Sequence, residues 1–436
     1  MPRKCGRDRP PTSPTERHVQ VNSSLNLDSR VQQGRVHRSV YVDPAIFEAE
    51  MELIFERGWV FVGHESEVPA AGDFKAVQIG RQPALLTRHT DGALHVVLNR
   101  CMHRGALLTR EQSGNTRAFR CLYHGWTFST NGDLLVVPFA EGYGEGFDQG
   151  SLGLIHAARV DSHRGFVFAS LSAAVPELRT ALGPAAGIID TIMDAAPEGA
   201  IKANGGVQKY TYNANWKLQA ENWVDGYHPT FTHQSAFAIV GKKTGAKPGS
   251  NQGSAARAVG LPNGHALLDY TGTSRAALNS EKDAAGYRAA LEARLGADRA
   301  GKVLESDLQI LLFPNLFIQS NAQHFRVLRP IAVDKTEVYA FPYRLCGAPD
   351  EINDRMTTKL GWWASAAGFG QPDDLEAFER CQEGLKVSQA EWLLFSRGLQ
   401  REQTMGDGRV VGDITDEVTH RGIYLEWARR MARAND

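Results

Sequence analysis

The sequence predicts an α+β protein built from an all-β domain and a larger domain in which strands and helices are segregated. From Trp59 to about Leu171 the chain consists of short β-rich runs, separated by turn signals such as Asp91-Gly92 and Asn131-Gly132. Strand-like runs return over residues 309–345, and helical patterns follow from residue 373 onward. Because these strands and helices do not alternate as βαβ units, the second domain is also expected to be α+β.

The chain divides into four predicted segments. Residues 1–37 are rich in Pro, Ser, Arg and Gln and lack the apolar stretch of a secretory signal, so they are expected to be disordered. Residues 38–58 predict one amphipathic helix with a start signal at Asp43-Pro44. The all-β domain then spans 59–172 and the larger domain 173–436, within which the Gly-rich segment 241–265 predicts a surface loop.

Composition excludes several classes of protein. The 436 residues include 48 Lys+Arg and 49 Asp+Glu, a net charge of −1, so no basic field for nucleic acid or anionic lipid is expected. The sequence contains no apolar run long enough for a membrane span. The five cysteines, at 5, 101, 121, 346 and 381, are too few for a disulfide framework and indicate a reducing compartment, the cytoplasm.

The first candidate site is a pair of loops that each contain one cysteine and one histidine. Cys101 and His103 are followed by Cys121 and His124 in the pattern C-x-H-x17-C-x-x-H. A zinc site is the alternative, but zinc fingers usually combine a Cys-Cys turn with a His-His helix, whereas both loops here are mixed. Mixed loops can direct both sulfurs to one iron and both nitrogens to the other, as a Rieske [2Fe–2S] centre requires. The motif therefore predicts an electron carrier.

The second candidate site lies in the larger domain, where two histidines, His228 and His233, are five residues apart. On the helix predicted before them, Glu221, Asp225 and His228 fall at i, i+4 and i+7, which places a polar cluster on one face. Pro229 disfavours helical backbone at His228, so the helix is expected to end there. His233 is then expected to come from the following turn.

A third ligand is expected from the segment 372–385. Four of its residues form one helical stripe: Asp374, Phe378, Cys381 and Leu385. Asp374 is therefore expected to face the core, while Asp373 is expected to cap the helix. An inward carboxylate needs a metal or a hydrogen-bond donor, although helix capping is the alternative role for Asp374. Together His228, His233 and Asp374 suit the two-His-one-carboxylate site of non-heme Fe(II).

With both sites considered, the sequence resembles the large (α) subunit of Rieske non-heme iron aromatic-ring-hydroxylating dioxygenases over about residues 38–430. It is most similar to the benzoate, toluate and anthranilate dioxygenase group. The segments that carry this resemblance are HESEVPAAGDF at 64–74, GRQPALLTR at 80–88, IIDTIMDAAPEGA at 188–200, NWKLQAENWVDGYH at 215–228 and PDDLEAFERCQEGL at 372–385. The resemblance implies a Rieske β domain inserted in a helix-grip catalytic domain with a curved antiparallel sheet.

The resemblance also implies how the two sites work together. It assigns Cys101, His103, Cys121 and His124 to the [2Fe–2S] cluster and His228, His233 and Asp374 to a mononuclear Fe(II). It implies that Asp225 links His228 to His124 of a neighbouring subunit, and that Asn222 lies beside the iron. A homotrimer of α subunits, usually joined by small β subunits as α3β3, is therefore expected.

The implied reaction uses O2 and electrons from NADH to convert an arene to a cis-dihydrodiol, with a benzoate-like carboxylate as substrate. The sequence has no GxGxxG fingerprint for a dinucleotide, so a separate reductase, with or without a ferredoxin, is expected to deliver the electrons. Two alternatives are a Rieske monooxygenase or demethylase and a Rieske electron carrier with a ligand-binding domain. Candidate pocket-lining residues are Trp223, Val224, Phe231, Phe317, Trp362, Trp363 and Phe369.

Overall fold

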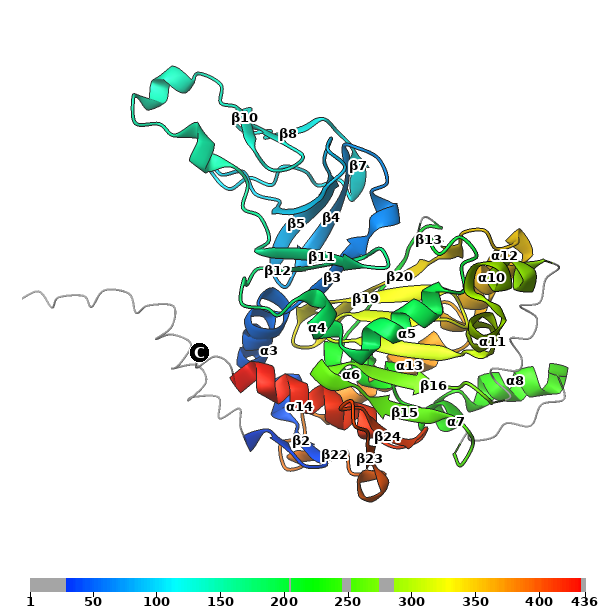
Figure 1. Cartoon of the computed structure of the whole chain (residues 1–436). Helices are drawn as coiled ribbons and strands as arrows, with labels where there is room; N and C mark the ends of the chain where they lie inside the picture. The colour runs from blue at the N-terminus through cyan, green and yellow to red at the C-terminus, as the bar shows by residue number, and fades with distance from the viewer. Residues whose placement is uncertain (1–28, 204, 245–251, 274–285, 433–436) are drawn as a thin grey trace, which may run out of the picture.

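The computed structural model describes residues 29–203, 205–244, 252–273 and 286–432. Figure 1 shows a smaller all-β body joined to a larger body in which helices flank a long sheet. Every strand pairing in both bodies is antiparallel among the described residues. The α+β class and the antiparallel sheet predicted from the sequence are therefore confirmed.

The first described residues are ordered, which makes the prediction of disorder wrong for 29–37. Strands β1 (Val31–Gln32) and β2 (Arg35–His37) pair with each other, and β2 also pairs with β22 (Trp392–Leu394). This segment is therefore ordered by pairing with β22, a strand more than 350 residues later in the chain. Local composition cannot predict such a distant pairing. Residues 1–28, the rest of the predicted disordered segment, lie outside the described residues.

The expected helix over 38–58 consists of three consecutive pieces: α2 (Ser39–Val42), α3 (Pro44–Glu50) and a π-helical turn (Met51–Glu56). Asp43 starts α3 by accepting a hydrogen bond from the N–H of Ala45 (2.9 Å). Glu50 is fully buried against the larger domain, where the indoles of Trp216 and Trp427 donate to its carboxylate (2.9 and 2.7 Å). This segment therefore packs with the larger domain although the β domain separates the two in sequence.

The β domain contains three small sheets. The strand order of the first sheet is β11 (Arg159–His163), β12 (Phe166–Ser170), β3 (Val60–His64). The order of the second sheet is β6 (Leu94–Leu98), β5 (Gln82–Arg88), β4 (Asp73–Ile79), β7 (Ser113–Asn115). The order of the third sheet is β10 (Leu134–Val136), β9 (Thr127–Ser129), β8 (Ala118–Arg120). Its core includes Leu85, Phe119 and Phe128, together with both loop cysteines. The third sheet lies at the end of the molecule farthest from the larger domain (Figure 1).

The larger domain is organised around a sheet of nine strands. Their order is β14 (Gln208–Tyr212), β20 (Lys335–Pro342), β19 (His324–Ala332), β18 (Leu316–Gln319), β17 (Leu308–Leu312), β16 (Ala266–Asp269), β15 (Arg257–Gly260), β24 (Val410–Asp413), β23 (Gln403–Thr404). A separate pair is formed by β13 (Ile201–Lys202) and β21 (Arg344–Leu345). The segment 241–265 is not one surface loop, because its small residues Ala258 and Gly260 are buried within β15 inside this sheet.

Helices cover both faces of the nine-stranded sheet (Figure 1). The described helices of this domain are α4 (Leu178–Leu182), α5 (Pro184–Met193), α6 (Trp216–Trp223), α7 (Pro229–Thr232), α8 (Gln234–Thr244), α10 (Tyr287–Leu295), α11 (Ala297–Glu305), α12 (Asp350–Lys359), α13 (Gln371–Gly384) and α14 (Val418–Ala432). Successive strand residues alternate between two cores: Leu311 packs with α6, α13 and α14, whereas Ile310 and Leu312 pack with α5 and α10. The first of these faces carries the candidate metal site.

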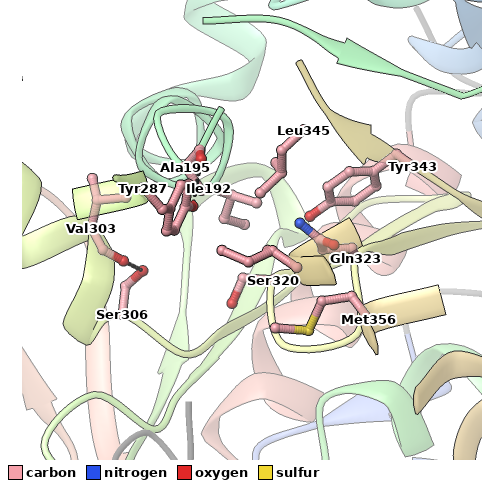
Figure 2. Close-up of a pocket in the computed structure, with 11 residues that line it drawn as sticks. Ile192, Ala195, Tyr287, Val303, Ser306, Ser320, Gln323, Tyr343, Leu345 and Met356 are labelled. Carbon is pink, nitrogen blue, oxygen red and sulfur yellow. Dashed lines mark hydrogen bonds between the residues drawn. The ribbon is translucent and has the colours of Figure 1, made fainter. Parts of the chain in front are cut away.

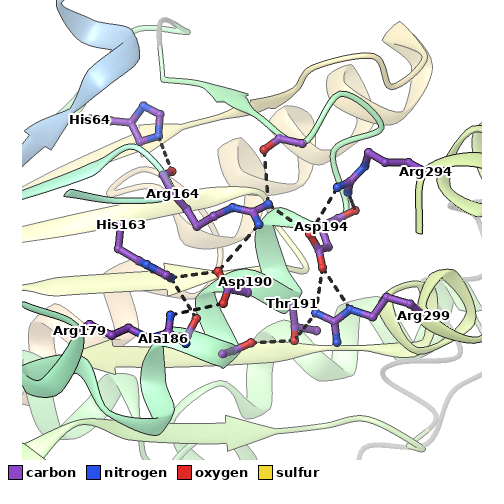
Figure 3. A network of polar contacts seen from close by, with 12 residues as sticks. His64, His163, Arg164, Arg179, Ala186, Asp190, Thr191, Asp194, Arg294 and Arg299 are labelled. Atoms are coloured by element: carbon purple, nitrogen blue, oxygen red, sulfur yellow. Dashed lines mark hydrogen bonds and ion pairs between the residues drawn. The ribbon is translucent and has the colours of Figure 1, made fainter. Parts of the chain in front are cut away.

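A polar network fastens the β domain to the larger domain (Figure 3). Arg164, in the turn between β11 and β12, reaches Asp194 (3.2 Å) just after α5. Asp194 also pairs with Arg294 (3.6 Å) and Arg299 (2.9 Å) from α10 and α11. Nearby, the side chain of Asn315 bonds both backbone groups of Phe61 in β3 (3.0 Å each). These contacts fix the orientation of the β domain within the chain.

One small enclosed cavity lies between α5, α10 and the sheet (Figure 2). Its volume is about 10 Å³, and its lining includes Ile192, Tyr287, Gln323 and Tyr343. A space of this size suits a single water molecule and is too small for an aromatic ring. Of the helices that the structure describes, none is long and apolar enough to cross a membrane.

Candidate metal centres

The two Cys-His loops have matching backbone geometry. The N–H of each cysteine donates across its own loop (2.8 Å in both), and the N–H groups of Gly105 and Gly125 donate to the carbonyls of Cys101 and Cys121 (3.0 Å in both). Both glycines have positive φ, +75° and +73°, which side chains disfavour. Each loop is therefore a tight turn that presents its cysteine and histidine together.

The four predicted side chains of these loops converge. Cys101 and Cys121 are buried, and the rings of His103 and His124 lie 4.5 Å apart between centroids. The Nδ1 atoms of both histidines are buried without a hydrogen-bond partner. Burial raises the pKa of the Cys101 thiol, and its hydrogen bond with Cys121 raises this pKa further. Two adjacent sulfurs and two unpaired ring nitrogens form the donor set that fits a Rieske cluster.

The second site brings His228, His233 and Asp374 together. One ligand atom from each of the three lies within 4.8 Å of the other two. The Nε2 atoms of His228 and His233 lie 3.6 and 3.2 Å from Oδ1 of Asp374. Two imidazoles and one carboxylate on one side of a centre form a donor set that fits a non-heme iron and leaves other coordination positions open.

A second carboxylate contacts each of these histidines on its other nitrogen. Nδ1 of His228 lies 3.2 Å from Oδ2 of Asp225, and Nδ1 of His233 lies 3.3 Å from Oδ2 of Asp373. Although burial opposes ionisation of Asp225, its interaction with His228 lowers the pKa of this carboxyl to about 2. A carboxylate behind a histidine fixes the ring so that Nε2 faces a metal.

Asn222 lies between the candidate ligands. Its Nδ2 atom is 3.1 Å from Nε2 of His228 and donates to Oδ1 of Asp374 (3.1 Å). The structure therefore brings together all of the residues that the sequence analysis placed at or beside the iron. Glu221 does not join them, because its carboxylate turns away to accept hydrogen bonds from Tyr41 and Tyr424.

The path of the chain at this site differs from the sequence prediction. Helix α6 ends at Trp223, one turn before His228, and Asp225 then accepts a hydrogen bond from the N–H of Tyr227 (2.6 Å). His228 has helical φ and ψ although Pro229 follows it, so the predicted exclusion of helical backbone at His228 is wrong, and Pro229 occupies the first position of α7. The turn separates Asp225 and His228 from the face of α6.

Helix α13 also corrects two expectations. Asp374 and Phe378 are buried as expected, but Cys381 is exposed and the buried residue on the next turn is Gln382. Asp373 is not the helix cap, because α13 begins two residues earlier at Gln371 and Asp373 instead contacts His233. The sequence did not predict that Asp373 contacts Nδ1 of His233. The only feature of the sequence that pointed to this contact is that Asp373 precedes Asp374.

Comparison with known proteins decides the family. A family model for the Rieske [2Fe–2S] domain matches residues 58–146, and one for the ring hydroxylating alpha subunit (catalytic domain) matches residues 201–432. The chain belongs to the ring-hydroxylating dioxygenase α-subunit family. This α subunit is thus a Rieske-type oxidoreductase that uses a [2Fe–2S] cluster and a mononuclear iron. The zinc site and the electron carrier without catalysis, both alternatives from the sequence, are excluded.

Several characterised proteins are similar to this α subunit over most of its length. The 2-halobenzoate 1,2-dioxygenase large subunit of Burkholderia cepacia is 33% identical, covering 89% of this chain and 85% of the relative. The toluate 1,2-dioxygenase subunit alpha of Pseudomonas putida is 35% identical, covering 84% and 82%. A solved structure of naphthalene 1,2-dioxygenase with indole bound in the active site has a TM-score of 0.81 at 28% identity, covering 92% and 93%.

Two of the predicted pocket-lining residues of the α subunit lie near the metal group, Trp363 by contact with His233 and Trp223 as the chain neighbour of Asn222. The ring of Trp363 contacts His233 edge-on (5.4 Å between centroids), and Trp223, next to Asn222, packs on the buried Phe317 (5.3 Å). Val224 is also buried, whereas Phe231 and Phe369 are largely exposed and Trp362 is partly exposed. Of these residues, Trp363 is therefore the one whose ring contacts a candidate iron ligand.

Proposed function

We propose that this α subunit is the terminal oxygenase of a system that cis-dihydroxylates an aromatic carboxylate such as a benzoate derivative. In the overall reaction, arene, O2, NADH and a proton give the cis-dihydrodiol and NAD⁺. The observation that carries this proposal is the convergence of His228, His233 and Asp374, in a chain whose relatives include dioxygenases named for halobenzoate, toluate and anthranilate.

The proposed roles follow from the donor atoms. Cys101, Cys121, His103 and His124 hold the cluster, and His228, His233 and Asp374 hold the mononuclear iron. When bound, these groups supply single-electron transfer and the activation of dioxygen. Asp225 and Asp373 lie 3.2 and 3.3 Å from Nδ1 of the two ligand histidines, where each carboxylate would favour a proton on Nδ1 and leave Nε2 as the donor to the metal. Asn222 orients Asp374 through its amide.

We further propose that electrons pass between subunits of a homotrimer. Within one chain, the third sheet of the β domain lies at the far end of the molecule from α7 (Figure 1). Large apolar side chains are exposed beside each centre: Leu122, Tyr123 and Phe139 in the β domain, and Tyr227 and Phe231 beside His228. Such surfaces are typical of protein interfaces. This supports the predicted link from His124 of one subunit to Asp225 of the next.

The remaining parts of the proposal concern partners and context. A separate reductase, with or without a ferredoxin, delivers electrons from NADH, and small β subunits complete an α3β3 hexamer. The protein acts in the cytoplasm, a placement supported by the absence of disulfides among the four described cysteines. We retain 59–172 as the Rieske domain, and 38–58 with 173–436 as the catalytic domain.

The test is a turnover assay of the complete system under labelled dioxygen. Benzoate, 2-chlorobenzoate, toluate and anthranilate are supplied with reductase and NADH, and the products are analysed by mass spectrometry. Incorporation of both atoms of one labelled O2 molecule into a diol acid supports the proposal. Incorporation of a single atom would instead indicate a monooxygenase. The matched control is His228→Ala, which should lose turnover while its cluster absorption is retained.

A further inference from the structure

A buried arginine faces the metal site from the central sheet. Arg326, in β19, has only 4% of its surface exposed and projects from the sheet face that packs against α6 and α13. Its register partner in β18 is Phe317, and the next residue on the same face of β19 is His324. Gln319, opposite His324, and Gln309, opposite Gln319, extend this polar row across three strands. Most of the other buried residues on this face are hydrophobic, among them Leu311, Phe317 and Leu328.

All the hydrogen-bond acceptors that Arg326 finds are neutral. Its Nε donates to Nε2 of His324 (3.2 Å), its Nη1 to the side chains of Gln371 and Tyr210, and its Nη2 to the carbonyl of Ala364 (3.0 Å). Burial and the neighbouring guanidinium hold the pKa of His324 well below its usual range, so this ring adds no charge. Of the residues that the structure describes, none forms an ion pair with Arg326.

A buried cation without an anion is unfavourable, because desolvation of the charge is not offset. One further donor points to the same place. The Nε2 atom of Gln371 is buried without a partner, and its Oε1 is already occupied by Arg326. An unpaired buried amide N–H also lowers stability unless an acceptor completes it. The cluster of Arg326 and Gln371 therefore has a cation and a spare donor, and among the described residues their hydrogen-bond partners include no anionic acceptor.

Arg326 contacts three residues that are close in sequence to members of the metal group or to a residue that touches it. Its guanidinium lies 4.8 Å from the ring centroid of Trp223, the residue after Asn222. Gln371 precedes Asp374 by three residues, so the two share one face of α13. Ala364 follows Trp363, whose ring contacts His233. An anion bound by Arg326 would thus lie beside the candidate iron ligands.

We infer that Arg326, together with the amide of Gln371, binds the carboxylate of the aromatic substrate and thereby sets its orientation over the metal group. This inference rests on the proposed function. The guanidinium supplies the charge and one remaining N–H on Nη2, and Nε2 of Gln371 supplies a second donor for the carboxylate. The ring of the substrate lies against Trp223, whose ring centroid is 4.8 Å from the guanidinium. A neutral arene would leave the charge of Arg326 uncompensated, so the site selects for aromatic acids.

The test compares two probes of the same shape, benzoate and the neutral nitrobenzene, on the assembled holoenzyme. Anaerobic equilibrium dialysis gives the Kd of each probe, and steady-state turnover gives kcat and KM. Arg326→Met is expected to weaken benzoate binding roughly 30-fold or more, while nitrobenzene binding is unchanged or tighter. Arg326→Lys should restore part of the benzoate affinity. The matched control, Arg329→Met, lies on the opposite face of β19 and pairs with Glu337 (3.3 Å), so it should bind both probes normally.

Each outcome decides the inference. Equal losses for benzoate and nitrobenzene in Arg326→Met, or unchanged benzoate affinity, would overturn it. If Arg326→Met does not fold, as judged by cluster absorption and iron content, Gln371→Leu decides: weaker benzoate binding with unchanged nitrobenzene binding supports the inference, and equal effects overturn it. If the wild-type enzyme converts none of the aromatic acids, the proposed function itself has failed. If the wild-type enzyme converts these acids but Arg326→Met has the same ratio of benzoate to nitrobenzene affinity as the wild type, only the assignment of Arg326 has failed.

Discussion

The Nε2 atom of His233 lies 3.2 Å from the Oδ1 atom of Asp374, although 140 residues separate the two in sequence. Only the packing of α13 against α6 and α7 brings them together. The carboxylate is almost fully buried, where an isolated negative charge would be strongly unfavourable. The contact is consistent with the predicted role of Asp374 as a ligand of a cation that both groups bind.

Replacing this carboxylate should remove one metal and leave the other. Asp374→Ala is expected to lose the mononuclear iron and all turnover but to retain the Rieske absorption spectrum, because the cluster is held by a different domain. Iron content per chain and visible absorption measure the two centres separately. The matched control is Glu376→Ala, because Glu376 lies two residues after Asp374 in α13 and is exposed. This variant should retain both metal centres. An iron content equal to that of the wild type would contradict the assignment of Asp374.

Asp225 is expected to affect electron transfer more than metal content. Asp225→Asn removes the charge behind His228 (3.2 Å) but keeps the size of the side chain. We expect both metals to remain and re-oxidation of the cluster in a single turnover to slow at least about 10-fold, the lower end of the activity loss that removing such a carboxylate causes. Stopped-flow absorption of the cluster gives this rate.

The comparison variant is Asp373→Asn. Asp373 lies 3.3 Å from Nδ1 of His233, the other ligand histidine, and it is not predicted to bridge subunits. It should weaken iron binding without a comparable effect on the rate of electron transfer once iron is bound. Equal rates in Asp225→Asn and the wild type would contradict the bridge.

The short-range parts of the molecule could be predicted from sequence. The Cys101 and Cys121 loops follow from spacing, and the buried position of Asp374 follows from its helical stripe with Phe378. The antiparallel sheet was an implication of the family resemblance rather than of local pattern. The boundaries of the domains and the roles of the site residues remain predictions.

Features that depend on distant partners could not be predicted. Strand β2 is ordered by β22, and β15 enters the sheet between β16 and β24, pairings that local composition does not encode. The contact of Asp373 with His233 depends on where α13 starts, and helix boundaries are the least reliable part of any sequence pattern. Arg326 reads in sequence as an ordinary strand residue, and only its burial reveals an unpaired charge.

The stability of the larger domain depends on a buried ion pair. Lys217 Nζ lies 2.6 Å from Glu50 Oε1, and both side chains are fully buried. Breaking such a pair leaves one uncompensated charge, so Lys217→Met is expected to lower the stability of the domain by about 3–5 kcal/mol. The midpoint of urea unfolding, followed by tryptophan fluorescence, measures the change.

The matched control for this pair is exposed. Arg380→Met removes the partner of Glu376 (2.7 Å), a pair in which both side chains are mostly in solvent, and should change stability by less than about 1 kcal/mol. The double variant Glu50→Gln with Lys217→Met should recover part of the loss, because it removes both buried charges. Equal effects of Lys217→Met and Arg380→Met would contradict the prediction.

Glu221 should make stability depend on pH near neutrality. Burial raises the pKa of its carboxyl to about 7, even though Tyr41 and Tyr424 donate hydrogen bonds to it. An ordinary Glu in the unfolded chain has a pKa of about 4.3, so between these values the folded state binds more protons than the unfolded state. The contribution of Glu221 to stability is therefore complete below about pH 4 and is lost as pH rises toward 7, with a slope on the order of 1 kcal/mol per pH unit.

Glu221→Gln removes this titration while keeping an oxygen that can accept from both tyrosines. The variant should therefore become more stable relative to the wild type as pH rises from 5 to 8. Thermal unfolding midpoints of both proteins, measured across this range in one buffer system, check the sign. The difference between the two midpoints must shift in favour of the variant with pH, since the neutral amide avoids the cost of a buried carboxylate. A difference that stays constant from pH 5 to 8 would show that Glu221 does not titrate in this window.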